Sequence, residues 1–512
     1  MENHPIAPHP IIGWEQTTPV PDGHQFNSYL QARNGRLFFK DLDLTNLFTG
    51  DGVDQGLGRT LPSPLEIVYL PLIRRQIGQM NAIFEEAIAE VGYDGRFLYA
   101  YASKANAAEE VIRTTLGAGA HHEMSSTIDV DIARLMRARG LLPPERMVIC
   151  NGFKAAGTLY AANIVQFKDE HANLIPVLEN LDELAPLLTS GKPFDVGLRQ
   201  KAYGPNLTEA AMENANSRFG MHLADIWKAA DYIAAAPNLT LTMYHAMVGS
   251  QMIDKAAFVD YLKPGIEVYA RLRRRYPTLQ IFNFGGGMPV AMTLDFTFDY
   301  RAFARRLLTT LQEICGRYGV PVPDVMGEFG RYTTTDHGAH LFQVIAAKDN
   351  NSDLPWYIIN GSIMSSFPDS WALGEHFICL PLNHLDRPFQ QVQLGGITCD
   401  SDDVYPPKQS AAPLYLPVET DGLYLGFFGI GAYQEMLGGV RGSKHCVLPE
   451  AYELIVDRDG PNGWRANDWR ANGWRANGWR EDRFQFEILH GQTPQDVLEN
   501  LGYRAAGDAA TR

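Results

Sequence analysis

Apolar runs of strand length alternate with segments of helical periodicity along the middle of the chain. Eight such runs occur between about residues 63 and 331: Phe97–Ser103, Ala120–Met124, Arg146–Cys150, Leu174–Leu178, Asp195–Arg199, Leu239–His245, Leu279–Phe284 and Asp324–Glu328. The segments between them repeat apolar residues at i, i+3 and i+4, the spacing of an amphipathic helix. Eight strand–helix units over roughly 270 residues are typical of an α/β fold, the TIM-like (β/α)8 barrel. A doubly wound sheet is the alternative.

The pattern differs on either side of this region. Residues 1–62 are rich in Pro, Gly, Asn and Asp and hold one short apolar run near Arg36–Lys40, so we predict an N-terminal arm whose strand joins a later sheet. After residue 335 short strand-like runs predominate; they are Leu341–Ala347, Trp356–Ile359, Val392–Ile397, Leu423–Phe428 and Phe484–Leu489. The sequence therefore predicts a barrel over residues 63–335 and a C-terminal antiparallel β-domain over residues 336–512.

A Trp-Arg repeat occupies residues 463–480. Trp464, Trp469, Trp474 and Trp479 follow one another in steps of five, and each is followed by an arginine. A step of five matches the period of neither a strand nor a helix. We predict an expanded loop between two strands, with a contact surface of stacked Trp–Arg pairs as the alternative.

Composition narrows the class of protein. The chain has 512 residues, of which 45% are hydrophobic and 20% charged, and this is enough to build two globular domains. A formal net charge of −15 without a basic patch argues against nucleic-acid and anionic membrane partners. Five scattered cysteines without CxxC spacing predict neither a disulfide framework nor a metal site. With no signal pattern and no apolar run of about 18 residues, we expect a cytoplasmic protein.

Unusual polar residues follow several predicted strands, where the active groups of a (β/α)8 barrel gather. Lys104 follows the first strand, and burial there would lower the pKa of its ammonium group toward the nucleophilic form. A solvated lysine at a strand end is the alternative. Ser125, Ser126, Asn151 and Gly152 follow the second and third strands, and His245 and the turn Gly249-Ser250-Gln251 follow the sixth.

A candidate phosphate site follows the last two strands. Gly285, Gly286 and Gly287 let backbone N–H groups approach a phosphate, and Arg331 is a suitable partner for the same group. Glu328 can hold a proton on a pyridine nitrogen. Pyridoxal phosphate needs a lysine, a phosphate cradle and such a ring partner, so these residues predict this cofactor. The alternatives are an ordinary glycine turn and a local ion pair.

Six short motifs of the chain resemble those of the alanine-racemase-fold, pyridoxal-phosphate-dependent decarboxylases of ornithine, diaminopimelate and arginine. The motifs are Tyr101-Ala-Ser-Lys-Ala-Asn106, Gly249-Ser-Gln251, Gly285-Gly-Gly287, Glu328-Phe-Gly-Arg331, Cys399-Asp400 and Gly431-Ala-Tyr433. Four stretches are most similar to the bacterial biosynthetic arginine decarboxylases: Ala82–Gly95, Ser366–Trp371, Ile397–Asp402 and Gly431–Gly438. The resemblance implies decarboxylation of arginine to agmatine in polyamine biosynthesis, with ornithine, lysine or diaminopimelate as alternative substrates.

The resemblance also implies roles for particular residues. Lys104 would bind the cofactor as an imine, Glu328 would bind its pyridine nitrogen, and His245 would belong to the cofactor-binding set. The phosphate would be held by Ser250, Gly285, Gly286, Gly287, Arg331 and Tyr433. In a homodimer with shared active sites, Cys399 would give a proton to the product α-carbon, and Asp400 would face the distal cation of the substrate. Taken by itself, Cys399 is more typical of an inert thiol.

Three features depart from the family pattern. Met247 stands where relatives carry a histidine that stacks on the cofactor ring, and methionine cannot donate a proton. Phe329 replaces a smaller residue and is expected to reshape the pocket floor. Only about 65 residues separate Arg331 from Ile397, where the arginine enzymes hold a helical insertion. These departures leave open a racemase, with Tyr433 as a second base, and a cofactor-binding protein that has lost turnover.

Overall fold

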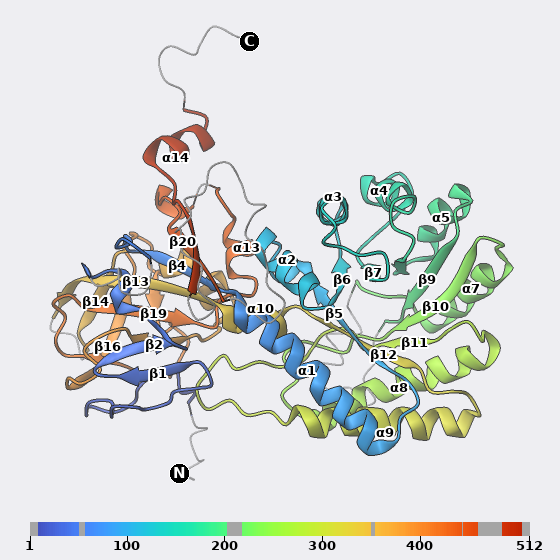
Figure 1. Cartoon of the computed structure of the whole chain (residues 1–512), viewed down its shortest axis with the longest axis horizontal. Coiled ribbons are helices and arrows are strands. Elements are labelled where there is room, and N and C mark those ends of the chain that lie inside the picture. The colour runs from blue at the N-terminus through green and yellow to red at the C-terminus, as the bar shows by residue number, and fades with distance from the viewer. Residues whose placement is uncertain are drawn as a thin grey trace, which may run out of the picture. The chain divides into compact units, whose positions relative to one another are not determined.

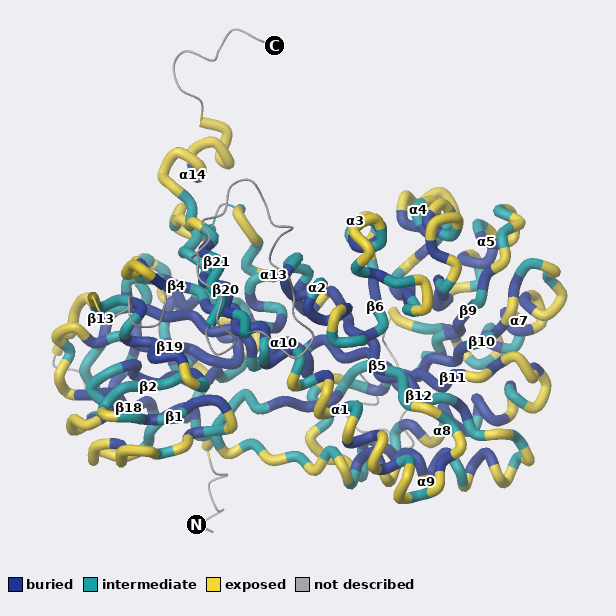
Figure 2. Tube along the Cα trace, viewed as in Figure 1, coloured by how far each residue is buried: buried dark blue, intermediate teal, exposed yellow. Residues whose placement is uncertain are grey.

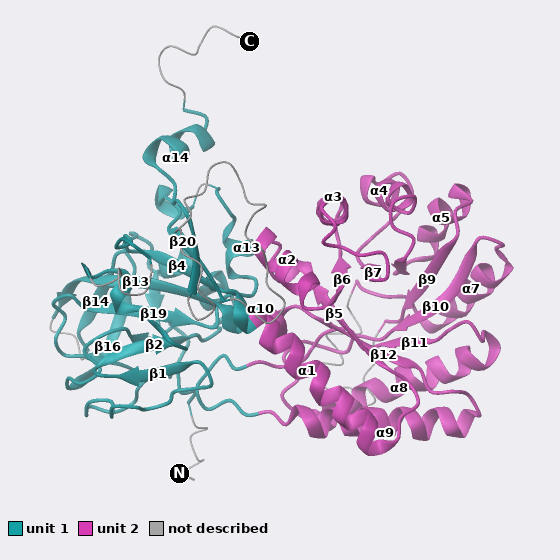
Figure 3. Cartoon of the chain, in the orientation of Figure 1, with its two compact units in different colours: residues 1–72, 291–297, 334–512 teal, residues 73–290, 298–333 magenta. Residues whose placement is uncertain are grey.

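The computed structural model describes residues 9–50, 57–201, 218–349, 354–442, 444–458 and 484–503. The chain forms two compact units, coloured separately in Figure 3. Unit 1 comprises residues 1–72, 291–297 and 334–512, and unit 2 comprises residues 73–290 and 298–333. The Trp-Arg repeat at 463–480 lies outside the described residues, so its loop stays a prediction.

Unit 2 is a closed barrel of eight parallel strands, in which the last strand pairs with the first to close the ring. The strands are β5 (Phe97–Ala102), β6 (His121–Met124), β7 (Val148–Cys150), β8 (Leu174–Leu178), β9 (Phe194–Arg199), β10 (Leu239–His245), β11 (Ile281–Asn283) and β12 (Asp324–Phe329). Every predicted apolar run overlaps one of them, and helices surround the strands (Figure 1). The predicted (β/α)8 barrel is confirmed, and the doubly wound sheet is excluded.

Capping residues determine where several of the surrounding helices begin and end. These helices are α1 (Leu70–Val91), α2 (Glu109–Gly117), α3 (Thr127–Ala138), α4 (Leu159–Phe167), α5 (Leu184–Ser190), α7 (Leu223–Ala235), α8 (Lys255–Arg275) and α9 (Tyr300–Tyr318). The side chains of Ser126, Asp254 and Asp299 accept hydrogen bonds from first-turn N–H groups of α3, α8 and α9. Gly319, at φ +65°, ends α9 in the left-handed conformation that glycine favours.

Unit 1 is built around a ten-stranded mixed sheet. Its strands are β4 (Leu65–Tyr69), β13 (Gly338–Lys348), β14 (Trp356–Ile359), β15 (Ile378–Pro381), β16 (Phe389–Gly395), β17 (Val404–Tyr405), β18 (Leu414–Pro417), β19 (Tyr424–Phe428), β20 (Tyr452–Arg458) and β21 (Phe484–Leu489). Most neighbours are antiparallel, as predicted, but β4 runs parallel to β20 and β14 runs parallel to β16. The predicted β-domain is therefore confirmed, and its sheet also contains two parallel pairs, which long connections make possible.

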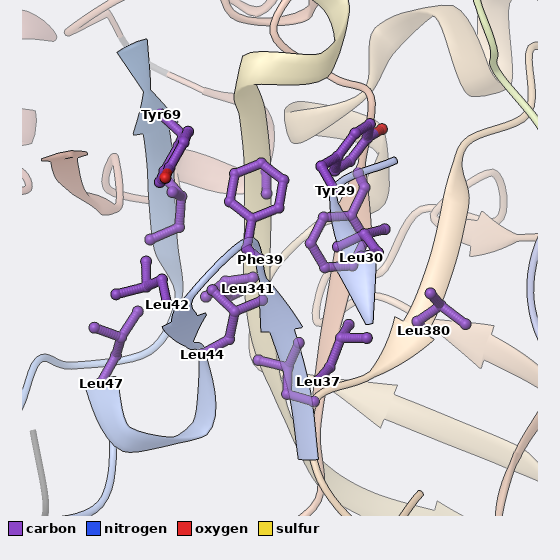
Figure 4. Packing of buried hydrophobic residues seen from close by; sticks show 14 of the residues in the cluster. Tyr29, Leu30, Leu37, Phe39, Leu42, Leu44, Leu47, Tyr69, Leu341 and Leu380 are labelled. Atoms are coloured by element: carbon purple, nitrogen blue, oxygen red, sulfur yellow. The ribbon is translucent and has the colours of Figure 1, made fainter. Parts of the chain in front are cut away.

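The N-terminal strands form a small sheet of their own. The run predicted near Arg36–Lys40 is β2 (Arg36–Phe39), which pairs with β1 (Leu30–Arg33) and β3 (Leu42–Asp43). The three strands pair with no strand of the ten-stranded sheet, but Leu37 N donates to the Leu382 carbonyl at 2.8 Å and Leu385 N donates to the Gly35 carbonyl at 3.0 Å. Phe39 and Leu37 are also fully buried in the same cluster as Leu341 and Leu380 (Figure 4). Burial of this apolar surface and these backbone hydrogen bonds together hold the N-terminal segment in the unit.

Burial follows the strands in both units (Figure 2). The barrel strands are almost wholly buried, whereas the helices around them expose one face, the amphipathic pattern that the sequence predicts. Within the described residues, no helix combines the length and the apolar character needed to cross a bilayer.

Candidate active site

A layer of polar side chains closes the carboxyl end of the barrel. Strand alternation sends every second residue to the same side, so a residue two positions after an interior apolar residue also faces the interior. Four strands follow this rule, with the pairs Ile149 and Asn151, Met243 and His245, Ile281 and Asn283, and Met326 and Glu328. Because parallel strands end at the same edge, the four polar side chains are brought together there.

Glu328 lies at the centre of this layer and is only 6% exposed. Its Oε1 accepts a hydrogen bond from Asn283 Nδ2 at 2.7 Å, and its Oε2 accepts one from Asn151 Nδ2 at 2.9 Å. Burial raises the pKa of this carboxyl group, while the Asn283 hydrogen bond and the charge of Lys104 act in the opposite direction. Two fixed amide donors therefore orient the carboxylate.

The same layer contains a second acid. Glu123 in β6 is fully buried, and its Oε1 accepts a hydrogen bond from Asn151 Nδ2 at 2.8 Å. Burial raises the pKa of Glu123 to about 7, with the charge of Lys104 opposing the shift and that of Glu328 adding to it. The sequence interpretation missed Glu123 and Asn283, although an acid within a buried strand is a readable signal.

His245, the last residue of β10, is 1% exposed. Neither of its ring nitrogens has a hydrogen-bond partner among the described residues, and Nε2 lies 3.7 Å from Glu328 Oε2. Burial, and then the charge of Arg199, hold the pKa of His245 well below 6.5, so the ring is neutral. A neutral imidazole with unused nitrogens is suited to receiving a ligand.

The glycine loop lies directly against His245 and Met247. A Cβ atom on Gly285 would lie 2.8 Å from His245 Nε2 and 2.9 Å from Met247 Cβ, and Gly285 has φ +69°. Glycine is therefore required both for space and for backbone conformation. Asn283 Oδ1 accepts a hydrogen bond from Gly285 N at 2.8 Å, which ties the loop to the amide that orients Glu328.

The two predicted phosphate segments lie against each other. A Cβ on Gly287 would lie 2.6 Å from the carbonyl oxygen of Gly249, and Met252 N donates to the Gly287 carbonyl at 3.0 Å. Gln251 Oε1 accepts from Val290 N at 3.0 Å, just after the glycine loop. Ser250 is exposed in the same turn. These contacts bring the Ser250 turn to the glycine loop, an arrangement that fits a phosphate cradle.

Lys104 and Arg331 follow the two strands that close the ring. Lys104 lies in a single 3-10 turn, η3 (Ser103–Ala105), after β5, and its charge acts on both Glu123 and Glu328. It is exposed within the single chain, so the desolvation predicted for its amine is not supplied by this chain alone. Arg331 opens α10 (Arg331–Thr334) directly after β12.

Two residues next to the predicted set have roles that the sequence did not anticipate. Arg199 pairs with Glu179 at 2.8 Å, and its Nη2 lies 3.9 Å from Met247 Sδ, so the Arg199 guanidinium lies beside Met247 at the edge of the polar layer.

Phe329 packs with Tyr99 at 4.7 Å between ring centroids. Because Phe329 neighbours the interior-facing Glu328 in the strand, it faces the helices. The prediction that Phe329 reshapes the pocket floor is therefore wrong.

The remaining predicted residues lie in unit 1. Cys399 Sγ is 3.9 Å from Cys446 Sγ, and Asp400 Oδ2 is 3.3 Å from His445 Nε2, so two consecutive residues face two consecutive residues. Asp403 anchors their loop by accepting from Thr398 Oγ1 at 2.6 Å. Tyr433 precedes α13 (Gln434–Gly438) at φ +70°, a strained backbone conformation for a tyrosine.

The polar layer fits pyridoxal phosphate. The unpartnered nitrogens of His245 and the space kept open by Gly285 and Gly287 provide room and polar groups for a ligand. Glu328 supplies an oriented carboxylate for a pyridine nitrogen, and a family comparison agrees. The model of the family described as pyridoxal-dependent decarboxylase, pyridoxal binding domain, matches residues 75–335.

The chain therefore belongs to the pyridoxal-dependent decarboxylases, with pyridoxal phosphate as cofactor, and both predictions are confirmed. It is 24% identical to arginine decarboxylase 1 of Oryza sativa subsp. japonica, over 78% of this chain and 71% of that one. The fold is similar to that of the biosynthetic arginine decarboxylase of Campylobacter jejuni, with a TM-score of 0.75, 21% identity, and coverage of 93% and 91% of the two chains. The diaminopimelate decarboxylase of M. jannaschii follows with a TM-score of 0.73, 17% identity, and coverage of 93% and 98%.

Proposed function

We propose that this enzyme decarboxylates a basic amino acid and that arginine, giving agmatine for polyamine biosynthesis, is its substrate. The observation that carries the proposal is the buried Glu328 carboxylate, held by Asn283 at 2.7 Å and Asn151 at 2.9 Å. The choice of arginine is supported by the names of relatives such as the Oryza sativa enzyme. Ornithine, lysine and diaminopimelate remain alternatives.

The bound cofactor supplies an electron sink for the charge left on the α-carbon when carbon dioxide departs. In the proposal, Lys104 provides the amine that binds the cofactor aldehyde. Glu328 holds a proton on the ring nitrogen, and its two amide partners keep the carboxylate in line without themselves exchanging protons. Arg331, Ser250 and the glycine loop neutralise and orient the phosphate.

The proton for the product and the binding of the distal cation are assigned to unit 1 of a second copy. Cys399 is exposed, and Asp400 carries the negative charge that an arginine side chain would need. Large apolar side chains are exposed on neighbouring segments of the same unit; they are Trp371, Leu373, Ile397, Leu437, Val440 and Val447. Exposed apolar surface of this kind supports contact with another protein surface, and we propose a homodimer with shared active sites.

Two further proposals concern the setting of the enzyme. All five cysteines are free thiols, which fits a reducing compartment, and we propose the cytoplasm. The net charge of −15 supports the proposal that the protein binds neither nucleic acid nor membrane surfaces.

Carbon dioxide release from a panel of arginine, ornithine, lysine and diaminopimelate tests the substrate. We expect arginine to give the highest kcat/KM, with agmatine as product. Preference for another member of the panel would replace arginine, and racemised amino acid without carbon dioxide would overturn decarboxylation. No turnover with bound cofactor would favour a protein that has lost catalysis.

Subunit mixing tests the shared site. Lys104→Ala and Cys399→Ala are each expected to be inactive, and a hybrid dimer would carry one site with both native groups. Recovered activity after mixing is the expected result. No recovery, with subunit exchange demonstrated by differently tagged chains, would mean that each chain holds a complete site.

A further inference from the structure

Glu123 is a buried acid that the proposed reaction does not use. It lies in β6 opposite Ala102 of β5 and is fully buried. Its Oε1 accepts the hydrogen bond from Asn151, whereas its Oε2 has no hydrogen-bond partner among the described residues. An ionised carboxylate with an unsatisfied oxygen is costly inside a protein, so a proton on that oxygen is the favourable state.

Asn151 connects this acid to the one that faces the cofactor. Its single Nδ2 donates one hydrogen to Glu123 Oε1 at 2.8 Å and the other to Glu328 Oε2 at 2.9 Å. Both distances are those of ordinary hydrogen bonds, and the amide has no third hydrogen. The two carboxyl groups therefore share one donor, and they lie close enough for the charge of Glu328 to raise the pKa of Glu123.

Two carboxylates that interact in this way do not ionise independently. The groups that act on Glu123 are Lys104, Glu328 and Asp129, and those that act on Glu328 include Lys104 and Arg199. Lys104 stabilises negative charge on both acids. A proton gained or lost by the pair changes the total negative charge at this end of the barrel by one unit.

We propose that Glu123 is a positioning residue that acts on the Glu328 carboxylate through Asn151 and thereby sets how firmly a proton is held on the cofactor ring nitrogen. The proposal rests on the cofactor part of the proposed function and is independent of the substrate. With Glu123 protonated, the pair carries one negative charge, on Glu328. When Glu123 releases its proton to solvent, a second negative charge faces the ring, and the proton on the ring nitrogen is bound more tightly.

A pH titration of the holoenzyme absorption spectrum, without substrate, tests this link. In the wild-type protein the band of the Lys104-bound cofactor should shift in a step between about pH 5 and about pH 9, the range in which an acid tuned toward neutrality titrates. Glu123→Gln keeps the shape and the hydrogen bond but cannot titrate, so it should bind the cofactor and lose the step. Glu123→Asp, which still titrates, should keep a step with a displaced midpoint.

A matched control removes a carboxyl group elsewhere. Glu66 lies in β4 of unit 1 and pairs with His340 at 3.1 Å, so Glu66→Gln should titrate like the wild type. In a Glu328→Gln background, the substitution Glu123→Gln should cause no further spectral change, because the link passes through Glu328. An unchanged midpoint in both Glu123→Gln and Glu123→Asp, or full additivity in the double variant, would overturn the proposal. Since no substrate is present, a wrong substrate assignment leaves this result unaffected.

Discussion

The barrel part and the unit 1 part of the candidate site differ in how much of their geometry one chain supplies. In the barrel, Glu328 is buried and its two oxygens are fixed by amides at 2.7 and 2.9 Å. In unit 1, Cys399 and Asp400 are on an exposed loop, where their neighbours are Cys446 at 3.9 Å and His445 at 3.3 Å. Strand register places the polar side chains of the first part within one chain, whereas Cys399 and Asp400 lie on a loop that this chain does not enclose.

This difference shows which side chains of the candidate site are held in fixed positions by the fold of one chain. Residues that end neighbouring parallel strands are placed by the hydrogen-bond ladder of the whole barrel. A loop residue depends on local anchors such as Asp403, and a solvent-exposed thiol gains a defined environment only when another surface covers it. Substitutions in the barrel should therefore act within the chain that carries them, whereas the proposed shared site predicts that substitutions in the loop act on the site of a second copy.

The largest effect is expected at Lys104. Lys104→Ala removes the amine that we propose binds the cofactor, so turnover should fall on the order of 10³-fold or more. Borohydride reduction of the wild type, followed by peptide mapping, should find a phosphopyridoxyl group on Lys104. A label on any other lysine would remove Lys104 from the site. Lys154→Ala is not a suitable control because Lys154 is buried beside Glu183, and the exposed Lys263 serves instead.

Glu328→Gln should be the next most damaging change. A neutral amide cannot hold the proton on the ring nitrogen, and removal of such an electrostatic partner typically costs on the order of 3–4 kcal/mol of barrier, or about 10²–10³ in kcat. Cofactor affinity should fall much less, because the residues proposed to hold the phosphate are unchanged. The two quantities are separated by measuring kcat alongside equilibrium binding of pyridoxal phosphate. Equal losses in both would mean that Glu328 acts mainly in binding.

The barrel and part of its site were predictable from the sequence because apolar strands and amphipathic helices repeat regularly along the chain. The alternation of apolar runs with helical segments predicts the barrel, and the residues just after each run are expected at the carboxyl end of its strands. His245, Glu328 and the glycine loop were identified in this way. Asn283 was missed because an asparagine that ends an apolar run is also an ordinary turn former. Its role is visible only when its amide is seen at 2.7 Å from Glu328.

The sequence was least informative where pairing is not periodic. The parallel pairing of β4 with β20 joins residues near 67 and near 454, and no local pattern encodes a partner so distant. The expectation that Phe329 reshapes the pocket floor was wrong because a motif gives the residue type without its orientation, whereas alternation from Glu328 determines which way Phe329 faces. Contacts between Asp400 and His445 were likewise beyond reach, since they depend on a turn with unusual backbone angles at Cys446 and Val447.

The protonation of Glu123 should also affect the free energy of unfolding. The pKa of Glu123 is raised from 4.5 to about 7 by burial, so the folded protein binds its proton more tightly than the unfolded chain does. The stabilisation that this proton gives the folded protein is fully present below about pH 4.5 and is lost as the pH rises through about 7. It amounts to about 3 kcal/mol of the free energy of unfolding. Apo-protein denaturation at several pH values should show this loss in the wild type. In Glu123→Gln the corresponding slope should be absent, and an identical slope in both would mean that Glu123 is already ionised.

Substitution of Met247 is expected to have the smallest effect on cofactor binding, and it tests the packing of the barrel part of the site. The side chain fills the space beside Gly285, where a Cβ would lie 3.1 Å from Met247 Cγ, and its sulfur lies 3.9 Å from Arg199 Nη2. Loss of such a packing group opens a cavity, so Met247→Ala should weaken cofactor binding by roughly 1–3 kcal/mol. Equilibrium titration with pyridoxal phosphate measures this. Affinity equal to that of the wild type would mean that Met247 does not contact the cofactor.

Met247→His restores the residue type that the family resemblance implies at this position, and its products decide why methionine is there. The new ring would lie beside the Arg199 guanidinium and the neutral His245, and the nearby positive charge would keep it neutral as well. A packing role for methionine therefore predicts that Met247→His decarboxylates as well as the wild type or somewhat better, with unchanged products. If methionine instead serves to withhold a proton donor, the wild type should release aldehyde, ketone or peroxide, and Met247→His should shift the products toward amine and carbon dioxide. Product analysis of both proteins distinguishes the two outcomes, and simple amine from the wild type would support the packing role that the Gly285 contact favours.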